Sequence, residues 1–376
     1  MKRILIDAYG TNSWIGGLYY KRNVVFSLLQ NKYITSTFEI VVITNLEGGK
    51  LFKAFLPKIK IKIAKSILDF YAKFSFLVFF KKVSFVFPSR KIHLFPLHRI
   101  CYINWIPDLQ HVKMPEFFSQ QEIDKRNHIF SLYCKSKKQP LIVSSFSSLK
   151  DLKSEYTCMA KVYVLHFVSF IEPEIKKFYS IDANSILYKY GIEKNRYFCI
   201  SNQFWRHKNH IVVFKAIKKI ILENKNFKYK FVFTGSLNDY RDPDYIKEIK
   251  RYVDDPIINP WIIITGFIDR IEQLLLMKNS LLIIQPSLFE GWGTVLEDAK
   301  VLNKKVILSD ILIHQEQKND NCILFNPLDY NDLSDKIIQN LIPCDSEYNN
   351  FSDMYSNAAL YSLSFEKLCR DFSNKR

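Results

Sequence analysis

The chain has 376 residues, of which 48% are hydrophobic and 24% are charged. This composition is typical of globular proteins and excludes a largely disordered or collagen-like chain, while the length predicts two or three domains. The 54 basic and 37 acidic residues give a net charge of +17, and residues 1–170 carry 26 of the basic but only 10 of the acidic ones. The two halves therefore differ in charge, which predicts different partners for each.

Three further features bear on location. The seven cysteines are scattered and form no C-x-x-C pair, which argues against a disulfide framework or a zinc site and fits a reducing compartment. The first residues, MKRILID, become charged too soon for a signal peptide. The longest mostly apolar run of the phenylalanine-rich stretch, residues 74–80 (FSFLVFF), is far shorter than the roughly 20 residues of a spanning helix. We expect a protein that is soluble or bound to a membrane surface.

Short β-branched runs alternate with apolar-periodic stretches in the first half. A strand at residues 4–6 is followed by a loop containing Gly16 and Gly17 and by a helix at residues 18–29. Further strands are expected at residues 38–44, 92–95, 101–105, 141–144 and 162–165. This alternation predicts a parallel, doubly wound α/β sheet.

The same alternation restarts after residues 166–196, a segment without a strand pattern that connects the two halves. Strands are expected at residues 197–201, 231–235, 261–266, 281–285 and 305–309. Helices are expected at residues 210–223, 244–253, 270–278 and 295–302. The chain therefore predicts a domain over residues 1–170 and a second over residues 171–354.

Residues 50–91 are basic and aromatic. They hold eleven basic residues and one acidic residue, Asp69, among ten phenylalanines and tyrosines. Such a surface suits the headgroup layer of an anionic membrane, where each Lys or Arg contributes about 1 kcal/mol. The alternatives are a solvated basic face beside a core helix, and nucleic-acid binding, for which no recognisable motif is present.

The most informative motif is Pro286–Ala299 (PSLFEGWGTVLEDA), which follows a predicted strand and opens a helix. Gly291 and Gly293 let the backbone approach a ligand, and the first N–H groups of the helix from about Val295 point into the same space, an arrangement that binds phosphate. Glu290 would repel phosphate but can accept hydrogen bonds from sugar hydroxyls. Amides for a diphosphate and carboxylates for hydroxyls are together what a nucleotide-sugar requires.

The run FEGWG at residues 289–293 resembles the first half of the E-x(7)-E hallmark of the retaining glycosyltransferases of family 4. That family has the GT-B fold, in which two Rossmann-like, doubly wound parallel-sheet domains face each other across a cleft. An ungapped match places Asp298 at the second acidic position, where Glu is usual, and Glu297 is its rival for the ribose. Neighbouring helical residues point about 100° apart, so one of the two acids faces the cleft. The resemblance implies donor contacts from Glu290, Gly291, Trp292, Gly293, Thr294, Val295 and one of these acids.

A second match lies after the first strand of the second half, in the segment NQFWRHKNH at residues 202–210. It resembles the family loop that ends in R-K-N-H, whose Lys neutralises the donor diphosphate, and Lys208 occupies that place. Gln203 stands where the family often has Arg, and Arg206 is a candidate to supply the missing charge. Residues 309–317 (SDILIHQEQ) and 325–329 (FNPLD) resemble the family's nucleotide-side segments.

In the first half, residues 105–118 (WIPDLQHVKMPEFF) resemble the family segment H-D followed by P-E-x-F. Pro107 takes the place of the family His, while Asp108 is kept and His111 lies three residues on. The resemblance implies that Asp108 and His111 lie at the cleft and act with Glu290 in catalysis. It also implies that Gly16 and Gly17 let the backbone pass near the donor phosphates, although a plain turn is the alternative, and that residues from about 355 to 376 form a helix returning to the first domain.

No metal or cofactor is expected. Asp242-Pro243-Asp244 has the D-x-D pattern of metal-dependent glycosyltransferases, but it lies at a predicted helix start, where Asp is a normal capping residue. Because no other metal-binding cluster is evident, the leaving diphosphate would be stabilised by cations and amides.

The resemblance implies transfer of a sugar, with retained anomeric configuration, from a nucleoside-diphosphate sugar of the GDP-mannose or UDP-hexose type. The basic first half suggests an acceptor anchored in a membrane, such as a lipid-linked or lipopolysaccharide-type glycan in bacterial O-antigen, capsule or lipopolysaccharide synthesis. We therefore expect a cytoplasmic mannosyl- or hexosyltransferase at the inner face of the membrane, with no nucleic-acid partner. The alternatives are a non-catalytic sugar-binding or scaffold member of the fold, and a basic nucleic-acid-binding protein.

Overall fold

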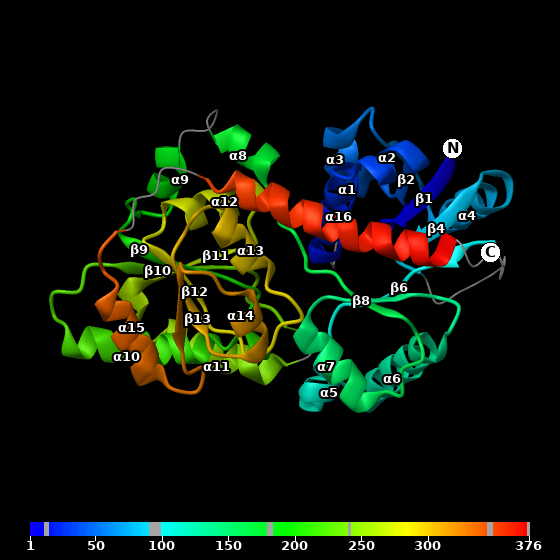
Figure 1. Ribbon diagram of the computed structural model, residues 1–376. Coiled ribbons are helices and arrows are strands. Elements are labelled where there is room, and N and C mark those ends of the chain that lie inside the picture. Colours follow the sequence, from blue (N-terminus) through cyan, green and yellow to red (C-terminus); the bar gives the residue numbers. More distant parts are fainter. Residues whose placement is uncertain (11–14, 90–98, 179–182, 240–241, 344–348, 374–376) are drawn as a thin grey trace. The chain divides into compact units, whose positions relative to one another are not determined.

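The computed structural model describes residues 1–10, 15–89, 99–178, 183–239, 242–343 and 349–373. The chain divides into two compact units, drawn in Figure 1. Unit 1 comprises Met1–Pro115, Ser119–Phe170 and Ser352–Arg376, and unit 2 comprises Glu116–Phe118 and Ile171–Phe351. The strand expected at residues 92–95 lies outside the described residues.

Unit 1 is built on parallel strands. They are β1 (Lys2–Asp7), β2 (Phe38–Thr44), β3 (Lys60–Ile63), β4 (Val83–Phe87), β5 (Cys101–Tyr102), β6 (Asn104–Ile106), β7 (Leu141–Val143) and β8 (Val162–Val164). One sheet has the order β3-β2-β1-β4-β5 and the other β6-β7-β8. Only Ile103 separates β5 from β6, so the strand expected at residues 101–105 is broken in two.

The helices of unit 1 cover these sheets with apolar side chains. They are α1 (Ile15–Leu29), α2 (Lys32–Thr37), α3 (Leu46–Phe52), α4 (Ile67–Phe80), α5 (Gln110–Lys113), α6 (Gln120–Lys135) and α7 (Phe146–Glu155). The helix α16 (Phe351–Ser373) returns to this unit at the end of the chain. Its Tyr361 hydroxyl lies 3.3 Å from that of Tyr20, and Asn31 donates a hydrogen bond to Glu366.

Unit 2 has one parallel sheet of six strands. They are β9 (Tyr197–Ser201), β10 (Lys230–Thr234), β11 (Ile262–Gly266), β12 (Leu282–Gln285), β13 (Val306–Ser309) and β14 (Cys322–Phe325). Their order is β11-β10-β9-β12-β13-β14. The connections therefore run one way from β9 and the other way from β12, and the crevice at the carboxyl ends of these two strands is where doubly wound sheets bind ligands.

Helices lie on both faces of the second sheet, as Figure 1 shows. One group is α10 (His210–Glu223), α11 (Pro243–Val253) and α15 (Tyr330–Gln339), and the other is α8 (Glu172–Phe178), α9 (Ala183–Lys189), α12 (Arg270–Asn279) and α13 (Thr294–Val301). The short helix α14 (Leu312–Gln317) follows β13. Fully buried side chains such as Phe198, Phe214 and Phe231 fill the core between the sheet and α10.

Most predicted elements of unit 2 are correct to within a residue or two, but unit 1 differs in two further respects. Gly16 and Gly17 were expected in a loop and instead lie in the first turn of α1. The strands β3 and β4 were not expected, because both lie in the basic stretch of residues 50–91, which was interpreted as a surface. The alternating Lys and Ile residues of β3 did not stand out within it. An edge strand with exposed lysines is a common protection against pairing with another chain. Among the helices of the described ranges, none is long and apolar enough to cross a membrane.

Candidate functional site

The loops that follow β9 and β12 are joined at the switch point of the second sheet. Lys208 ends a turn of 3-10 helix after β9, and Glu290 lies in the loop between β12 and α13. The Leu288 N–H donates to the His207 carbonyl at 2.8 Å. Asn209, in the left-handed conformation with φ 56°, donates from its side chain to the Pro286 carbonyl at 3.2 Å. Two segments about 80 residues apart therefore form one surface.

Lys208 and Glu290 form an ion pair within this surface. The Lys208 Nζ lies 2.6 Å from Glu290 Oε1, and the two side chains are only 14% and 10% exposed. The ammonium has three N–H donors, and within the described ranges Glu290 is the only side chain bonded to it. Lys208 therefore keeps donors for a further anion.

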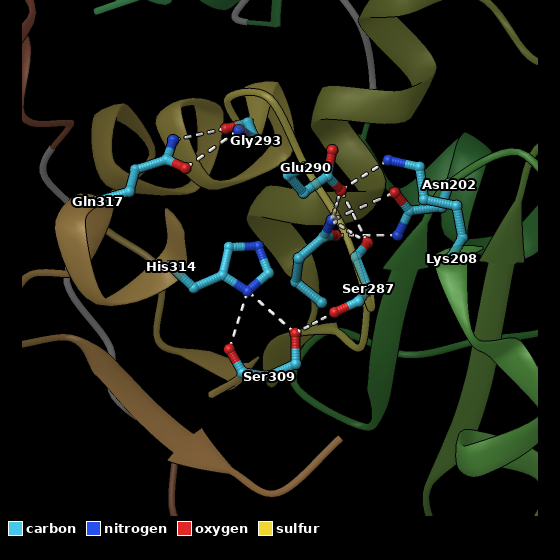
Figure 2. A network of polar contacts seen from close by, with 9 residues as sticks. Asn202, Lys208, Ser287, Glu290, Gly293, Ser309, His314 and Gln317 are labelled. Carbon is cyan, nitrogen blue, oxygen red and sulfur yellow. Dashed lines mark hydrogen bonds and ion pairs between the residues drawn. The ribbon is translucent and has the colours of Figure 1, made fainter. Parts of the chain in front are cut away.

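Glu290 is held by neutral donors as well, as Figure 2 shows. Its Oε1 accepts hydrogen bonds from Gln285 Nε2 at 2.9 Å and from the Ser287 hydroxyl at 2.7 Å. No described residue donates a hydrogen bond to the other oxygen, Oε2. Burial alone would raise the pKa of the carboxyl, but the Lys208 ammonium, together with His314 and His207, outweighs burial and lowers the pKa to about 2. Glu290 is thus an oriented carboxylate with one oxygen left to accept hydrogen bonds.

The N-terminus of α13 lies directly beyond this loop. The backbone of Gly293, the residue just before α13, is hydrogen-bonded to the side chain of Gln317 on α14. Gln317 Oε1 accepts from the Gly293 N–H at 3.1 Å, and Gln317 Nε2 donates to the Gly293 carbonyl at 2.7 Å. The N–H groups of Thr294 and Val295 have no acceptor among the described residues. These two donors, together with the helix dipole, provide the anion-binding capacity of this end.

The two acidic candidates on α13 are both buried and both paired with a cation. Asp298 Oδ1 lies 2.6 Å from Arg270, whose other guanidinium nitrogen donates to Gln273. Gln273 in turn donates to Ser201 at the carboxyl end of β9. Glu297 instead pairs with Lys300 at 2.9 Å and accepts from Gln317 at 2.8 Å. Asp298 is therefore connected to the switch point, whereas Glu297 is connected to α14.

Two other predicted donor residues make internal contacts. Gln203 Oε1 accepts a hydrogen bond from the Ser236 N–H at 2.9 Å. Arg206, considered as a replacement for a missing cation, pairs with Asp242 at 2.5 Å and lies over the Tyr245 ring. Asp242 also caps α11 by accepting from the Tyr245 N–H, as predicted for this D-x-D pattern.

The remaining predicted residues lie in unit 1. Asp108 is partly exposed, accepts from the Gln110 N–H and lies 3.9 Å from Arg126. His111 is buried with its Nε2 3.1 Å from Asn127 Oδ1, and burial lowers its pKa. This position favours a role for His111 in supporting the segment that carries Asp108. Gly16 and Gly17 lie at the start of α1.

Sequence reasoning missed four polar residues that hold the predicted ones. Gln285 and Ser287 bond Glu290, Asn202 bonds Gln285, and Gln317 bonds Gly293. A polar residue at the end of a buried strand, as at Gln285, is the one available signal. In the described part of the chain, no three His, Cys, Asp or Glu side chains are grouped so that they could hold a metal ion. Function without a metal remains a prediction.

Residues 182–353 match the family model of the glycosyl transferases group 1. The match contains Lys208, Glu290 and both acids of α13. The O-antigen chain mannosyltransferase RfbU of Salmonella typhimurium is 25% identical over 197 residues, which cover 49% of this chain and 53% of RfbU. The chain thus matches about half the length of this curated relative.

Solved structures share the fold along nearly the whole chain. HepE of Anabaena, in complex with UDP and glucose, has a TM-score of 0.64 at 13% identity and covers 100% of this chain and 98% of HepE. WaaG, a glycosyltransferase involved in lipopolysaccharide biosynthesis, has a TM-score of 0.58 at 12% identity and covers 96% of this chain and 95% of WaaG. The predicted GT-B class, α/β with two Rossmann-like parallel-sheet domains, is confirmed. The similarity to glycosyltransferases is thus one of sequence in residues 182–353 and one of fold along the whole chain.

Proposed function

We propose that this protein is a retaining glycosyltransferase that transfers a sugar from a nucleoside-diphosphate sugar to a membrane-anchored glycan. The observation that carries the proposal is the meeting of Lys208, Glu290 and the N-terminus of α13 at the switch point of the second sheet. A cation and free backbone donors suit a diphosphate, and an oriented carboxylate suits sugar hydroxyls.

The leaving group determines the chemistry. As the bond between the sugar C1 and the diphosphate breaks, negative charge develops on the diphosphate, and the Lys208 ammonium and the N–H groups of Thr294 and Val295 stabilise it. The acceptor hydroxyl oxygen forms its bond to C1 on the same face, and its proton passes to the departing phosphate.

Orientation of the donor comes from carboxylates. The free Oε2 of Glu290 accepts hydrogen bonds from hydroxyls of the transferred sugar, while its Oε1 stays bonded to Lys208, Gln285 and Ser287. Asp298 is the stronger candidate for the ribose, because its partner Arg270 leads to Ser201 at the switch strand. Holding the ring in one reactive orientation lowers the entropic part of the barrier.

We propose GDP-mannose or a UDP-hexose as the sugar donor. RfbU is by name a mannosyltransferase of the O-antigen chain, and the HepE structure contains UDP with glucose. The names of RfbU and WaaG also support a surface-polysaccharide or lipopolysaccharide glycan as the proposed acceptor. Unit 1 is the proposed acceptor-binding unit, with the partly exposed Asp108 as a candidate catalytic acid.

A membrane surface is the proposed partner of unit 1, and the inner face of the cytoplasmic membrane is the proposed location of the protein. Helix α4 packs Phe70, Leu77 and Val78 into the core. Leu68, Phe76 and Phe80, spaced by multiples of four residues, are 78%, 51% and 74% exposed and share its opposite face. Exposed Lys65, Lys81 and Lys82 flank this face. Aromatic rings bordered by lysines suit insertion among anionic headgroups.

The test is a thermal-shift screen of the full chain against UDP, GDP and their sugars, followed by turnover assays on hits. A dissociation constant tenfold tighter for one nucleotide adds about 1.4 kcal/mol of stabilisation under excess ligand. We expect one nucleotide family to stabilise the protein and its sugar to be turned over. Unchanged turnover in Glu290→Ala would favour a non-catalytic sugar-binding or scaffold role for this loop.

A further inference from the structure

Two buried side chains of helix α14, Gln317 and His314, support the candidate donor loop (Figure 2). Gln317 bonds the Gly293 end directly, and His314 bonds Ser309, which in turn bonds Ser287. Gln317 makes three hydrogen bonds, and all three go to the start of α13. Its carbonyl accepts from the Gly293 N–H at 3.1 Å, and its amide nitrogen donates to the Gly293 carbonyl at 2.7 Å and to Glu297 at 2.8 Å. Both amide hydrogens and the oxygen of Gln317 are thus used.

This contact fixes the two peptide groups on either side of the Gly293 Cα, one through the N–H of Gly293 and the next through its carbonyl. Pairing with both the N–H and the carbonyl of Gly293 determines where the following N–H groups, those of Thr294 and Val295, point. A Cβ at Gly293 would lie 3.2 Å from the Gln317 oxygen, which is tighter than an ordinary contact. The absence of a side chain at Gly293 therefore allows Gln317 to reach the peptide.

His314 supports the other end of the same loop through Ser309. Its Nδ1 lies 2.9 Å from the Ser309 carbonyl, which can only accept, so Nδ1 carries the proton. The Ser309 hydroxyl donates to the Ser287 carbonyl at 2.5 Å, and the Ser287 hydroxyl donates to Glu290. Helix α14 thus supports both the carboxylate of the loop and the amides at its end.

We infer that Gln317 is a positioning residue for a nucleoside diphosphate. It holds the two peptide groups around Gly293 so that the N–H groups of Thr294 and Val295 face the phosphates. This inference rests on the proposed function and adds a residue that contacts no substrate. Preorganised donors need such support, because a displacement of about 1 Å costs up to about 100-fold in rate.

The experiment compares the full-length wild type with Gln317→Met, Gln317→Glu and Gln315→Met. Methionine keeps the length of the side chain and removes the three hydrogen bonds. Gln315, an exposed neighbour on α14 that donates to Asp310, is the matched control. Calorimetry with UDP and GDP, well below the melting temperature of every variant, gives the dissociation constants. We expect Gln317→Met to weaken diphosphate binding at least about tenfold, and Gln315→Met to leave it unchanged.

Gln317→Glu supplies a readout that a purely structural role would not change. Its carboxylate would face the Gly293 carbonyl and Glu297, which itself pairs with Lys300. On protonation the carboxyl regains a donor and mimics the amide. The ratio of variant to wild-type dissociation constants should therefore fall toward one as the pH is lowered from 8 to 5 in steps of about one unit.

The outcomes separate the two proposals. If the wild type binds neither UDP nor GDP, the proposed function fails. If the wild type binds and Gln317→Met binds equally well, the positioning role is overturned while the function stands. Should Gln317→Met not fold, the Glu variant decides: a ratio that stays constant with pH overturns the positioning role.

Discussion

The Lys208 ammonium lies 2.6 Å from Glu290 Oε1 although 82 residues separate them in the chain. The predicted diphosphate-binding cation and the predicted sugar-binding carboxylate are thus partners of each other. In the resting site this pair is electrically balanced, and each member keeps capacity for a ligand: two N–H donors on Lys208 and the Oε2 of Glu290. A nucleotide-sugar presents an anion to the first and hydroxyls to the second.

The buried pair should be strongly coupled in stability. Removing one member leaves the other buried without its counter-charge, which costs roughly 3–5 kcal/mol. We expect Lys208→Met and Glu290→Gln each to lower the free energy of unfolding by this order, and the double variant to lose less than the sum. Urea unfolding of the four proteins without ligand measures the coupling. Strictly additive losses would show that the pair contributes nothing as a unit.

His210 should make stability pH-dependent. The ring is fully buried against Phe204, and burial lowers its pKa to about 3. Because the unfolded chain takes up a proton near pH 6.5 and the folded chain does not, stability falls as the pH drops from about 6.5 toward 3. Between pH 7 and pH 5 the loss is about 2 kcal/mol. We expect His210→Phe to remove this part of the loss in urea titrations at the two pH values, and an unchanged loss would contradict the assignment.

The two acids of α13 should differ in their effect on the donor. Asp298→Asn is expected to raise the KM for the nucleotide-sugar at least about tenfold, through loss of a ribose hydrogen bond to a charged group worth about 1.5–3 kcal/mol. Glu297→Gln keeps an acceptor for Gln317 and should change KM less. Steady-state kinetics of the two variants provide the comparison. The reverse order would assign the ribose to Glu297.

The exposed face of α4 should bind anionic lipid. Phe76→Gln combined with Phe80→Gln removes two exposed rings. We expect binding to vesicles rich in phosphatidylglycerol to drop at least about tenfold, since each ring contributes about 1.5–3 kcal/mol when it is fully buried. Leu222→Gln, at a 60% exposed position of α10, is the control. Binding should also weaken with salt and with Lys81→Glu. Equal vesicle binding by the double variant, or displacement of vesicles by RNA, would contradict a lipid surface here.

The local pattern of apolar residues was sufficient to predict the strands of the second sheet, but it predicted those of the first sheet less well. Strands such as Tyr197–Ser201 and Leu282–Gln285 are buried on both faces, so a short, mostly apolar run marks them. Lys60–Ile63 is an edge strand with exposed lysines, and nothing local separates it from a basic loop. Gly16 and Gly17 were assigned to a loop because glycine weakens a helix, yet the start of α1 accommodates them.

For the candidate site, the spacing of Glu290, Gly293 and Asp298 was readable because one loop and one helix carry all three. The partners of these residues were not, since Gln285, Arg270 and Gln317 approach from other elements. Hydrogen bonds between distant segments depend on the packing of the sheet, which a single sequence does not display. The orientation of the Arg206 and His111 side chains depends on the same packing. Arg206 is bonded to Asp242, and His111 is buried beside Asn127.

The most direct test of the central claim is calorimetric titration of UDP and GDP into the wild type, Lys208→Met and Lys218→Met. Lys218 pairs with Asp255 on the outer side of α10 and serves as the matched cation control. The account predicts that one nucleotide binds the wild type and Lys218→Met with equal affinity and binds Lys208→Met at least about tenfold more weakly, as expected for loss of a buried charge-assisted hydrogen bond. Equal affinity for all three proteins would contradict it.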